Sequence, residues 1–302
     1  MLPPRGPRNP AKVSLLVVYK KSQLELYHEH QPGEFESLER REASLVEPYH
    51  IAHNENLAAI EKVKTVIRGH GIEARFSYRA HHESTDGYDL VISVGGDGTL
   101  LDVSHNVFHA PLLGVNSSTY SVGHYCATNC DGFGELFERW MRRKVEATPL
   151  QRLRVAVNGK RARTPVLNEV LLSHVIPAAM SRYLIEIDGV SEQHKSSGIW
   201  ISTAAGSSAA IRSAGGQLMD PTDVRMQYVV REPYRWGGLS FELGGGIIDG
   251  PIRLLSKMRT GGLYLDGHRE QLTLALGDRI FIDPHPNPLC VVGYRRPQAP
   301  GS

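Results

Sequence analysis

The sequence predicts two domains, an α/β domain with an open parallel sheet followed by a mostly β domain. Before residue 149, apolar runs typical of buried strands alternate with segments of helical periodicity. After residue 149, helical periodicity nearly vanishes, and short alternating segments separated by turn dipeptides take over. The length of 302 residues exceeds that of one typical core, which also favours two domains.

The first domain is expected to contain four strands separated by helical segments. Each expected strand is a short apolar run bounded by polar or small residues, as in buried strands of parallel sheets. These strands are expected over residues 13–19, 73–78, 90–94 and 112–115. Amphipathic periodicity predicts helices over 99–107 and 134–143.

The segment between the first two strands is the least regular part of this domain. Residues 20–48 are charged and weakly patterned, so we expect a long loop with some helix there. A helix is then expected to begin with Asn54 as its N-cap and to end near Gly69 and Gly71. Its apolar face is formed by residues at helical spacing: Leu57, Ile60, Val63 and Ile67.

Short strands dominate the rest of the chain. They are expected over residues 153–157, 170–173, 183–187, 199–202, 228–231, 252–254, 263–265, 280–282 and 289–292. Three dipeptides are typical of two-residue hairpin turns: Asn158-Gly159, Asp188-Gly189 and Asp266-Gly267.

These patterns set the expected domain limits. Residues 1–11 lack an apolar signal core and are expected to be a disordered leader. The α/β domain is expected over 12–148 and the β-rich domain over 149–283. Residues 284–302 should hold the final strand and a loose tail, and the sequence leaves open whether that strand returns to the first domain.

Composition excludes several classes of function. A formal net charge of +2 gives no broad electrostatic basis for binding nucleic acid or a membrane surface. No apolar stretch approaches the 18 residues that a membrane span needs. The three cysteines, Cys126, Cys130 and Cys290, are few and odd in number, which favours a reducing compartment and a cytoplasmic location. We interpret Cys126 and Cys130 as buried thiols rather than metal ligands.

The most informative motif follows the strand expected at 90–94. Gly95, Gly96 and Gly98 surround Asp97 and precede Thr99. Glycines let the backbone approach a ligand closely, and their N–H groups can form a nest for phosphate oxygens. The carboxylate would then contact a substrate hydroxyl or a metal ion. A tight turn with a solvated Asp explains this motif, taken alone, equally well.

Two further clusters suit a nucleotide. Residues 202–216 are mostly Ser, Thr, Ala and Gly, which leave room for a flat ring and offer hydrogen bonds without bulk. Asn168 and Glu169 lie between apolar residues, and together they suit ribose hydroxyls or an adenine amino edge. The alternatives are a tightly packed turn for the first cluster and a solvated strand edge for the second.

Taken together, these motifs resemble the NAD kinase family, which phosphorylates the 2′-hydroxyl of the adenosine ribose in NAD or NADH. The matching elements cover roughly residues 12–295, in the family's order: Gly95 to Thr99, Gly114-Val115-Asn116, Asn168-Glu169, Gly206 to Ala209, and Ser213 to Gly216. The resemblance implies a Rossmann-like first domain and a β-rich, cofactor-binding second domain. The glycine turn alone is shared with diacylglycerol and sphingosine kinases.

The resemblance also implies roles for individual residues. Asp97 would be the catalytic base, and Gly95, Gly96, Gly98 and Thr99 would bind the phosphates of ATP. NAD or NADH would be bound by a larger set: Asn116, His124, Asn168, Glu169, Lys195, Ser197, Ser208, Ala209, Ala210 and Ser213. Mg²⁺ would be held through substrate phosphates, without a dedicated protein ligand. The partners would be small-molecule nucleotides, and the chain would form a homodimer or homotetramer.

Some residues depart from the commonest bacterial pattern of the family. Ser197-Gly198 stands where many members have Asp-Gly, and Ala210 stands where many have Tyr. The loop after Asn116 is longer and ends in Gly123-His124-Tyr125-Cys126. These features are similar to plant-type NADH kinases, as are residues 196–198, 202–207, 230–233 and 264–267. The similarity implies a preference for NADH.

Two other functions stay open. A lipid kinase could use the same glycine turn, but no basic amphipathic helix is evident. A catalytically silent dinucleotide sensor would fit Ser197 and Ala210, whereas Asp97 with its three glycines argues against it. The sequence does not rank NAD against NADH, or ATP against polyphosphate as the phosphoryl donor.

Overall fold

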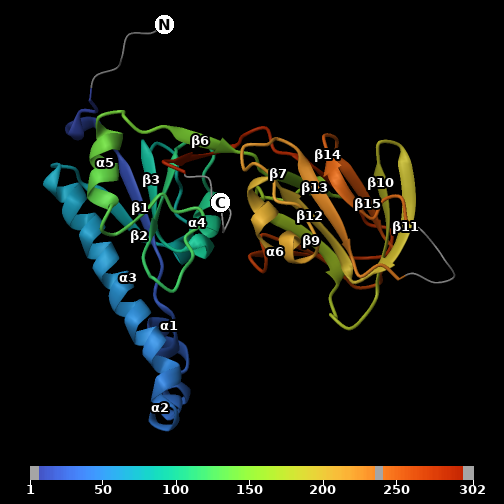
Figure 1. Ribbon diagram of the computed structural model, residues 1–302, viewed down its shortest axis with the longest axis horizontal. Helices are drawn as coiled ribbons and strands as arrows, with labels where there is room; N and C mark the ends of the chain where they lie inside the picture. The colour runs from blue at the N-terminus through green and yellow to red at the C-terminus, as the bar shows by residue number, and fades with distance from the viewer. Residues whose placement is uncertain (1–6, 235–240, 295–302) are drawn as a thin grey trace, which may run out of the picture. The chain divides into compact units, whose positions relative to one another are not determined.

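The computed structural model describes residues 7–234 and 241–294 and divides the chain into two units (Figure 1). The first unit comprises residues 1–148 and 290–302, and the second comprises 149–289. The expected tail at 295–302 and the first six residues of the expected leader lie outside the described residues. Among the described residues, none of the helices combines the length and apolar character needed to span a membrane.

A seven-stranded sheet forms the centre of the first unit. Its order is β2-β1-β3-β4-β19-β6, with β5 beside β4, and β1 is parallel to both β2 and β3. The strands are β1 (Leu15–Tyr19), β2 (Ala74–Tyr78), β3 (Leu90–Gly95), β4 (Leu112–Asn116), β5 (Thr128–Asn129), β6 (Ala147–Leu150) and β19 (Leu289–Val292). The apolar runs of β1, β3 and β4 are buried because helices cover the sheet.

The final strand belongs to this sheet. Val291 of β19 pairs in parallel with Leu112 of β4, so the chain returns to the first unit after completing the second. The sequence left this point open.

Three helices pack against the first sheet or follow its strands. They are α3 (Ala43–Gly69), α4 (Asp97–Ser104) and α5 (Phe133–Met141). α5 buries the apolar face that its periodicity predicts: Leu136, Phe137, Trp140 and Met141. α3 ends at Gly69 as expected, with Val63 and Ile67 in the core.

The segment expected to be mainly loop is helical, which corrects the prediction for residues 20–48. α1 (Gln23–His30) and α2 (Pro32–Arg41) pack with the first part of α3, and Figure 1 shows them extending beyond the sheet of this unit. Ser22 and Glu25 cap α1 reciprocally. A small core of Leu24, Phe35 and Val46 holds the three helices together. We refer to α1, α2 and residues 43–52 as the helical arm.

The N-cap predicted at Asn54 is also wrong, because Asn54 lies inside a longer helix. α3 begins at Ala43, eleven residues earlier, and continues through Pro48 and Asn54. Burial of Val46 in the arm core helps to offset the helical hydrogen bond that Pro48 cannot make. Packing within the arm therefore overrides the local capping signal.

Part of the expected leader is ordered, which also differs from the prediction. The Arg8 N–H donates to the Met141 carbonyl at 2.8 Å, and the Arg8 guanidinium lies 4.1 Å from the centre of the Trp140 ring. Pro10–Lys12 forms a short 3-10 helix capped by Asn9. Contact with α5 thus fixes residues that carry no strong pattern of their own.

The second unit contains two six-stranded sheets, in the orders β11-β10-β15-β18-β7-β8 and β14-β13-β12-β9-β16-β17. Apolar residues of both sheets form one shared core. The strands are β7 (Leu153–Val157), β8 (Lys160–Arg161), β9 (Glu169–His174), β10 (Ser181–Ile187), β11 (Val190–Ser196), β12 (Gly198–Thr203), β13 (Met226–Arg231), β14 (Gly245–Ile248), β15 (Ile252–Ser256), β16 (Gly261–Leu265), β17 (Glu270–Leu274) and β18 (Arg279–Pro284).

The three predicted hairpin turns are confirmed. Asn158, Asp188 and Asp266 have φ values of 51°, 50° and 49°, and each is followed by a glycine with positive φ. Such a pair of left-handed residues matches the twist of two antiparallel strands.

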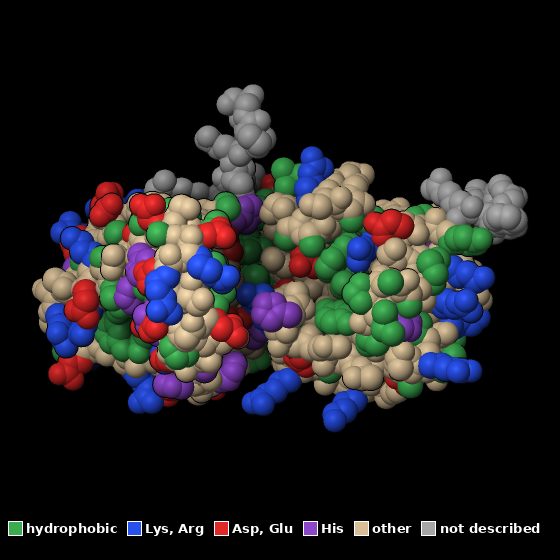
Figure 2. All heavy atoms as spheres, turned by 90° about the horizontal axis from the view of Figure 1, so that it is seen from below, with side chains coloured by type: hydrophobic (Ala, Val, Ile, Leu, Met, Phe, Trp, Pro, Cys, Tyr) green, Lys and Arg blue, Asp and Glu red, His purple; other side chains and the backbone are tan. Residues whose placement is uncertain are grey.

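Acidic and basic side chains are interspersed over the face of the first unit shown in Figure 2.

Candidate functional site

The glycine turn after β3 is shaped by close packing. A Cβ on Gly95 would lie 2.2 Å from Thr99 Oγ1, and a Cβ on Gly96 would lie 2.0 Å from Ser121 Oγ. Side chains at these two positions would therefore displace the residues that border the turn. The turn brings the end of β3 directly into α4, whose first residue is Asp97.

Asp97 is held by the backbone of the loop after β4. Its Oδ1 accepts the Tyr125 N–H at 2.8 Å, and the side chain is partly exposed. Burial lowers the pKa of the neighbouring His124, although Asp97 opposes this shift, so the imidazole is neutral at pH 7. Burial and the Asp97 charge raise the pKa of Cys126 to about 12, which keeps its thiol protonated.

Thr99, which is expected to bind phosphate, packs closely within the turn. Its N–H donates to the Gly96 carbonyl at 2.9 Å, and its side chain is buried against Gly95. Both contacts hold the shape of the turn.

Asn116 lies beside this turn because β4 pairs with β3. Asn116 is opposite Gly95, and its Nδ2 donates to the Ser121 carbonyl at 2.9 Å. Its Oδ1 is buried and accepts no hydrogen bond from the described residues. A buried acceptor without a partner carries an energetic cost, so a ligand hydroxyl or amino group would stabilise it.

The loop after Asn116 is tied to α3 by polar contacts that the sequence did not reveal. Ser117 Oγ donates to Asn56 Oδ1 at 2.8 Å, and Asn56 Nδ2 donates to the Lys20 carbonyl at 3.1 Å. Glu55 accepts hydrogen bonds from Ser118 and Thr119. Asn56 could have indicated these contacts, because a polar residue on the buried face of a helix needs a hydrogen-bond partner.

In the second unit, Asp266 organises the segment that contains Asn168 and Glu169. Its buried carboxylate accepts the N–H groups of Leu167, Asn168 and Glu169 at 2.9, 2.7 and 3.2 Å. The sequence indicated Asp266 as a hairpin residue and as part of the segment 264–267 that is similar to plant-type NADH kinases, but not as an acceptor of these N–H groups. It therefore has a second role that sequence reasoning missed.

Glu169 is buried at the start of β9. Its Oε2 has no hydrogen-bond partner among the described residues. Burial, together with the nearby Asp266 charge, raises the pKa of Glu169 to about 8, while Arg269 acts in the opposite direction. The side chain is mostly protonated at pH 7, so it can donate as well as accept a hydrogen bond.

The small-residue cluster lies beside this pair. Ser202 of β12 is opposite Glu169 of β9, and both Ser202 Oγ and the Thr203 N–H donate to the Asn168 carbonyl. A Cβ on Gly206 would lie 2.3 Å from the same carbonyl oxygen. The chain then forms a 3-10 helix (Ala205–Ser208) and the short α6 (Ala210–Ser213), which places Ser208, Ala209, Ala210 and Ser213 just beyond β12.

Ser197 lies at the opposite end of β12, and Lys195 lies in β11, which precedes it in the chain. Ser197 precedes β12, whereas Ser202, opposite Glu169, lies near its other end, about 17 Å away along the strand. Ser197 lines a cavity of about 350 Å³ together with Trp200, Arg231 and Tyr264. The structure thus separates these two predicted residues from the Asn168–Glu169 cluster.

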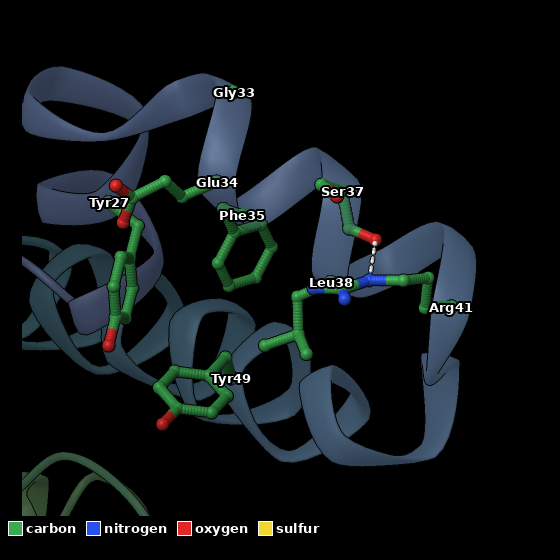
Figure 3. A pocket seen from close by; sticks show the side chains of 8 residues that line it. All are labelled: Tyr27, Gly33, Glu34, Phe35, Ser37, Leu38, Arg41 and Tyr49. Carbon is green, nitrogen blue, oxygen red and sulfur yellow. Dashed lines mark hydrogen bonds between the residues drawn. The ribbon is translucent and has the colours of Figure 1, made fainter.

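Another cavity, of about 620 Å³, lies on the helical arm (Figure 3). The rings of Tyr27, Phe35 and Tyr49 surround it, with ring centres 5.3 to 6.1 Å apart. None of the residues expected to act on a nucleotide lines this cavity.

Known proteins resemble this chain in sequence. The family model described as ATP-NAD kinase N-terminal domain matches residues 22–145. A protein of Oryza sativa subsp. japonica named "Probable NADH kinase" is 32% identical over 219 residues, which are 64% of this chain and 67% of that protein. The NADH kinase of Arabidopsis thaliana is 33% identical over 228 residues, 64% of this chain and 69% of that protein.

A solved structure shares the fold. The crystal structure of yeast NADH kinase complexed with NADH matches with a TM-score of 0.69 at 17% identity, covering 95% of this chain and 85% of that chain. The match spans an α/β domain with a parallel sheet and a mostly β domain, as the sequence predicted.

Proposed function

The chain belongs to the NAD kinase family, and on this premise we propose that it transfers a phosphoryl group from ATP to the 2′-hydroxyl of the adenosine ribose of NAD or NADH. The product is NADP or NADPH. The observation that carries the proposal is the Asp97 carboxylate between two glycines at the end of β3, with one oxygen anchored by a backbone N–H.

Asp97 is the proposed general base. It accepts the proton of the ribose 2′-hydroxyl as that oxygen attacks the terminal phosphorus of ATP in line. The new O–P bond forms while the bond from this phosphorus to the ADP oxygen breaks, and ADP leaves with the electron pair. Positioning and charge stabilisation supply most of the rate in such transfers. We assign Gly95, Gly96 and Gly98 to the phosphates.

Asn116 and His124 are proposed to border the acceptor nucleotide. The unpartnered Oδ1 of Asn116 would accept a hydrogen bond from a hydroxyl or amino group of the substrate. The neutral imidazole of His124 can donate or accept a hydrogen bond without repelling a cation. Both residues lie in the same unit as Asp97.

The second unit is proposed to bind the adenosine portion. Asn168 and Glu169 would contact the ribose, since Glu169 offers an unpartnered oxygen and Asp266 fixes the backbone of both residues. Ser208, Ala209, Ala210 and Ser213 would border the adenine. We assign Lys195 in β11 and Ser197, which precedes β12, to the nicotinamide end of the dinucleotide.

Mg²⁺ is proposed to bind through the phosphates of the donor, whose charge it would offset. Such a cation needs few protein ligands of its own, because phosphate oxygens and water complete its coordination. We also propose a cytoplasmic homodimer or homotetramer. Free thiols at all three cysteines suit a reducing compartment, and light scattering during gel filtration would measure the assembly.

A crossed activity assay tests the function. The purified chain is incubated with NAD or NADH and with ATP or polyphosphate, each with Mg²⁺, and NADP or NADPH is quantified. Product from NADH and ATP is expected, because two relatives are named NADH kinases. Tight binding of NADH without any product would instead favour a dinucleotide sensor.

Asp97→Asn identifies the catalytic group. Loss of a positioned general base typically lowers turnover about 10²- to 10⁴-fold, and the KM for NADH should change little. Asp86→Asn is the matched control, because Asp86 is an exposed carboxylate of the same unit. Wild-type turnover in Asp97→Asn would remove Asp97 from the mechanism.

A further inference from the structure

The first sheet reverses its direction of growth between β1 and β3. The strand order β2-β1-β3-β4 makes β1 and β3 neighbours, while the chain continues from them toward opposite edges. Ligands of open parallel sheets bind outside the carboxyl ends of the strands at such a point. Lys20 follows β1, and its N–H donates to the Val94 carbonyl of β3 at 3.4 Å. Lys20 therefore lies beside the glycine turn.

A cavity of about 350 Å³ opens at this point. Its lining combines apolar and polar groups from the end of β1, the base of the helical arm and the loop after β4, and includes Lys20, Tyr49, Ala52, Ser118, Tyr120 and Ser121. Ser121 also contacts Gly96, as the 2.0 Å approach of its Oγ to a Cβ built there indicates. The cavity thus adjoins the turn that presents Asp97, and its size is that of a small-molecule site.

Lys20 brings a positive charge without a counterion into this cavity. Within residues 7–234 and 241–294, no carboxylate lies within ion-pair distance of its amine. By contrast, Lys21 pairs with Glu29, and Arg79 pairs with Asp102 at 2.9 Å. Burial and the nearby Arg79 lower the pKa of Lys20. A half-buried cation beside another cation is stabilised by an anionic ligand.

The walls of the cavity are held in place before any ligand binds. Asn56 links the Lys20 carbonyl to Ser117, and Glu55 fixes Ser118. Tyr49 packs against Tyr27 and Phe35 in the core of the arm, where Figure 3 shows the three rings together. A site that is already ordered loses less entropy when a ligand binds.

We propose that this cavity binds the nucleoside of the phosphoryl donor, with the Lys20 amine on the donor's phosphates. The inference rests on the proposed kinase function and specifies its donor as a nucleoside triphosphate rather than polyphosphate. Tyr49 and Tyr120 provide aromatic surface for a base, and a polyphosphate chain would leave this surface unused. The helical arm is then part of the donor site, because it supplies Tyr49 and Ala52.

Two variants separate the parts of the donor that the cavity binds. Lys20→Met should raise the KM for ATP and the Ki of inorganic tripolyphosphate about 10- to 100-fold, because a charged hydrogen bond is lost. Ala52→Phe narrows the nucleoside region, so it should raise the KM for ATP at least about tenfold and leave the Ki of tripolyphosphate within about twofold. Lys20→Arg keeps the charge and should recover most of the affinity for ATP.

Lys21→Met is the control, since Lys21 already pairs with Glu29, and its KM for ATP should stay within about twofold of the wild type. Circular dichroism establishes that each variant is folded, and Tyr120→Ala replaces Ala52→Phe should the latter not fold, because Tyr120 is 58% exposed. An unchanged KM for ATP in Lys20→Met overturns the inference. Equal use of polyphosphate and ATP by the wild type does so as well.

Calorimetric titration with MgATP keeps this test independent of the kinase assignment. If the wild type forms no NADP or NADPH, the proposed function fails, and ATP binding that Lys20→Met weakens about tenfold or more would still support the cavity. If the wild type is active but Lys20→Met binds MgATP as tightly as the wild type, the cavity inference fails and the kinase function stands.

Discussion

Replacing Glu169 by Gln should make the chain more stable at alkaline pH, and the gain should depend on pH in a defined way. Burial first, and then the Asp266 charge, raise the pKa of Glu169 from an ordinary 4.5 to about 8. The folded state therefore keeps a proton between these two pH values that the unfolded state has lost. Because the unfolded state binds fewer protons in this interval, the free energy of unfolding falls as pH rises.

The size of the effect follows from the same interval. Stability contributed by the protonated carboxyl is fully present below pH 4.5 and is lost as pH rises through about 8. Each pH unit in the interval costs at most about 1.4 kcal/mol, which limits the total to about 5 kcal/mol. A neutral amide at position 169 has no such dependence. The stability of Glu169→Gln relative to the wild type should therefore rise from pH 5 to pH 8 and then level off.

Urea denaturation of both proteins at pH 5, 6, 7, 8 and 9 measures this difference. Glu270→Gln is the control, because Glu270 is partly exposed at the start of β17 and no buried carboxylate is removed. The control should follow the wild type at every pH. A stability difference between Glu169→Gln and the wild type that does not vary with pH would refute the reasoning that Glu169 is protonated in the folded state.

Two other substitutions test the proposal that the second unit binds part of NADH. Asp266→Asn places an amide N–H₂ against a backbone N–H that the carboxylate now accepts, so the free energy of unfolding should fall by about 2–4 kcal/mol and the KM for NADH should rise. Loss of the Asp266 charge should also lower the pKa of Glu169, which would shift the pH dependence of stability. Asp249→Asn, at an exposed position, is the control and should change none of these. Gly206→Ala places a Cβ 2.3 Å from the Asn168 carbonyl oxygen, so it should lower the free energy of unfolding by about 1–3 kcal/mol and weaken NADH binding in fluorescence titration. Gly244→Ala is the control: its Cβ would meet nothing within 4 Å, and this variant should bind NADH normally.

Short-range patterns were sufficient for most strands and hairpins. β3 is predictable because a short run of consecutive apolar residues is typical of a strand that is buried on both faces of a parallel sheet. The Asp188-Gly189 turn is predictable because its two left-handed residues need little from the rest of the fold. β11 was missed, since Val190–Ser196 is almost entirely polar and becomes a strand only by pairing with β10 across that turn.

The helical arm could not be predicted because it depends on tertiary packing rather than on short-range patterns. Its three helices carry few apolar residues, and each is stable only because Leu24, Phe35 and Val46 meet in one small core. Asn54 has the sequence signature of an N-cap, but tertiary packing extends the helix eleven residues before it. A local capping signal contributes only about 1 kcal/mol, so it does not by itself fix where a helix begins.

The candidate site also contains both residues that the sequence indicates and residues that only the fold reveals. Asp97, Asn116, Asn168 and Glu169 lie in short motifs that residue chemistry alone makes conspicuous. Asp266 orients two of them from 98 and 97 positions away in the sequence, and Lys20 approaches the glycine turn only because β1 pairs with β3. Residues that position a site act through tertiary contacts, so a single sequence carries little signal for them.

Each unit contains a buried side-chain oxygen without a hydrogen-bond partner among the described residues. Asn116 Oδ1 in the first unit and Glu169 Oε2 in the second are buried oxygens without partners among the described residues. Each unpartnered buried acceptor costs about 1–3 kcal/mol, and proteins retain few of them. A nucleotide carries hydroxyl and amino groups that can donate to such oxygens. A ligand that donates a hydrogen bond to either oxygen would stabilise the unit that contains it.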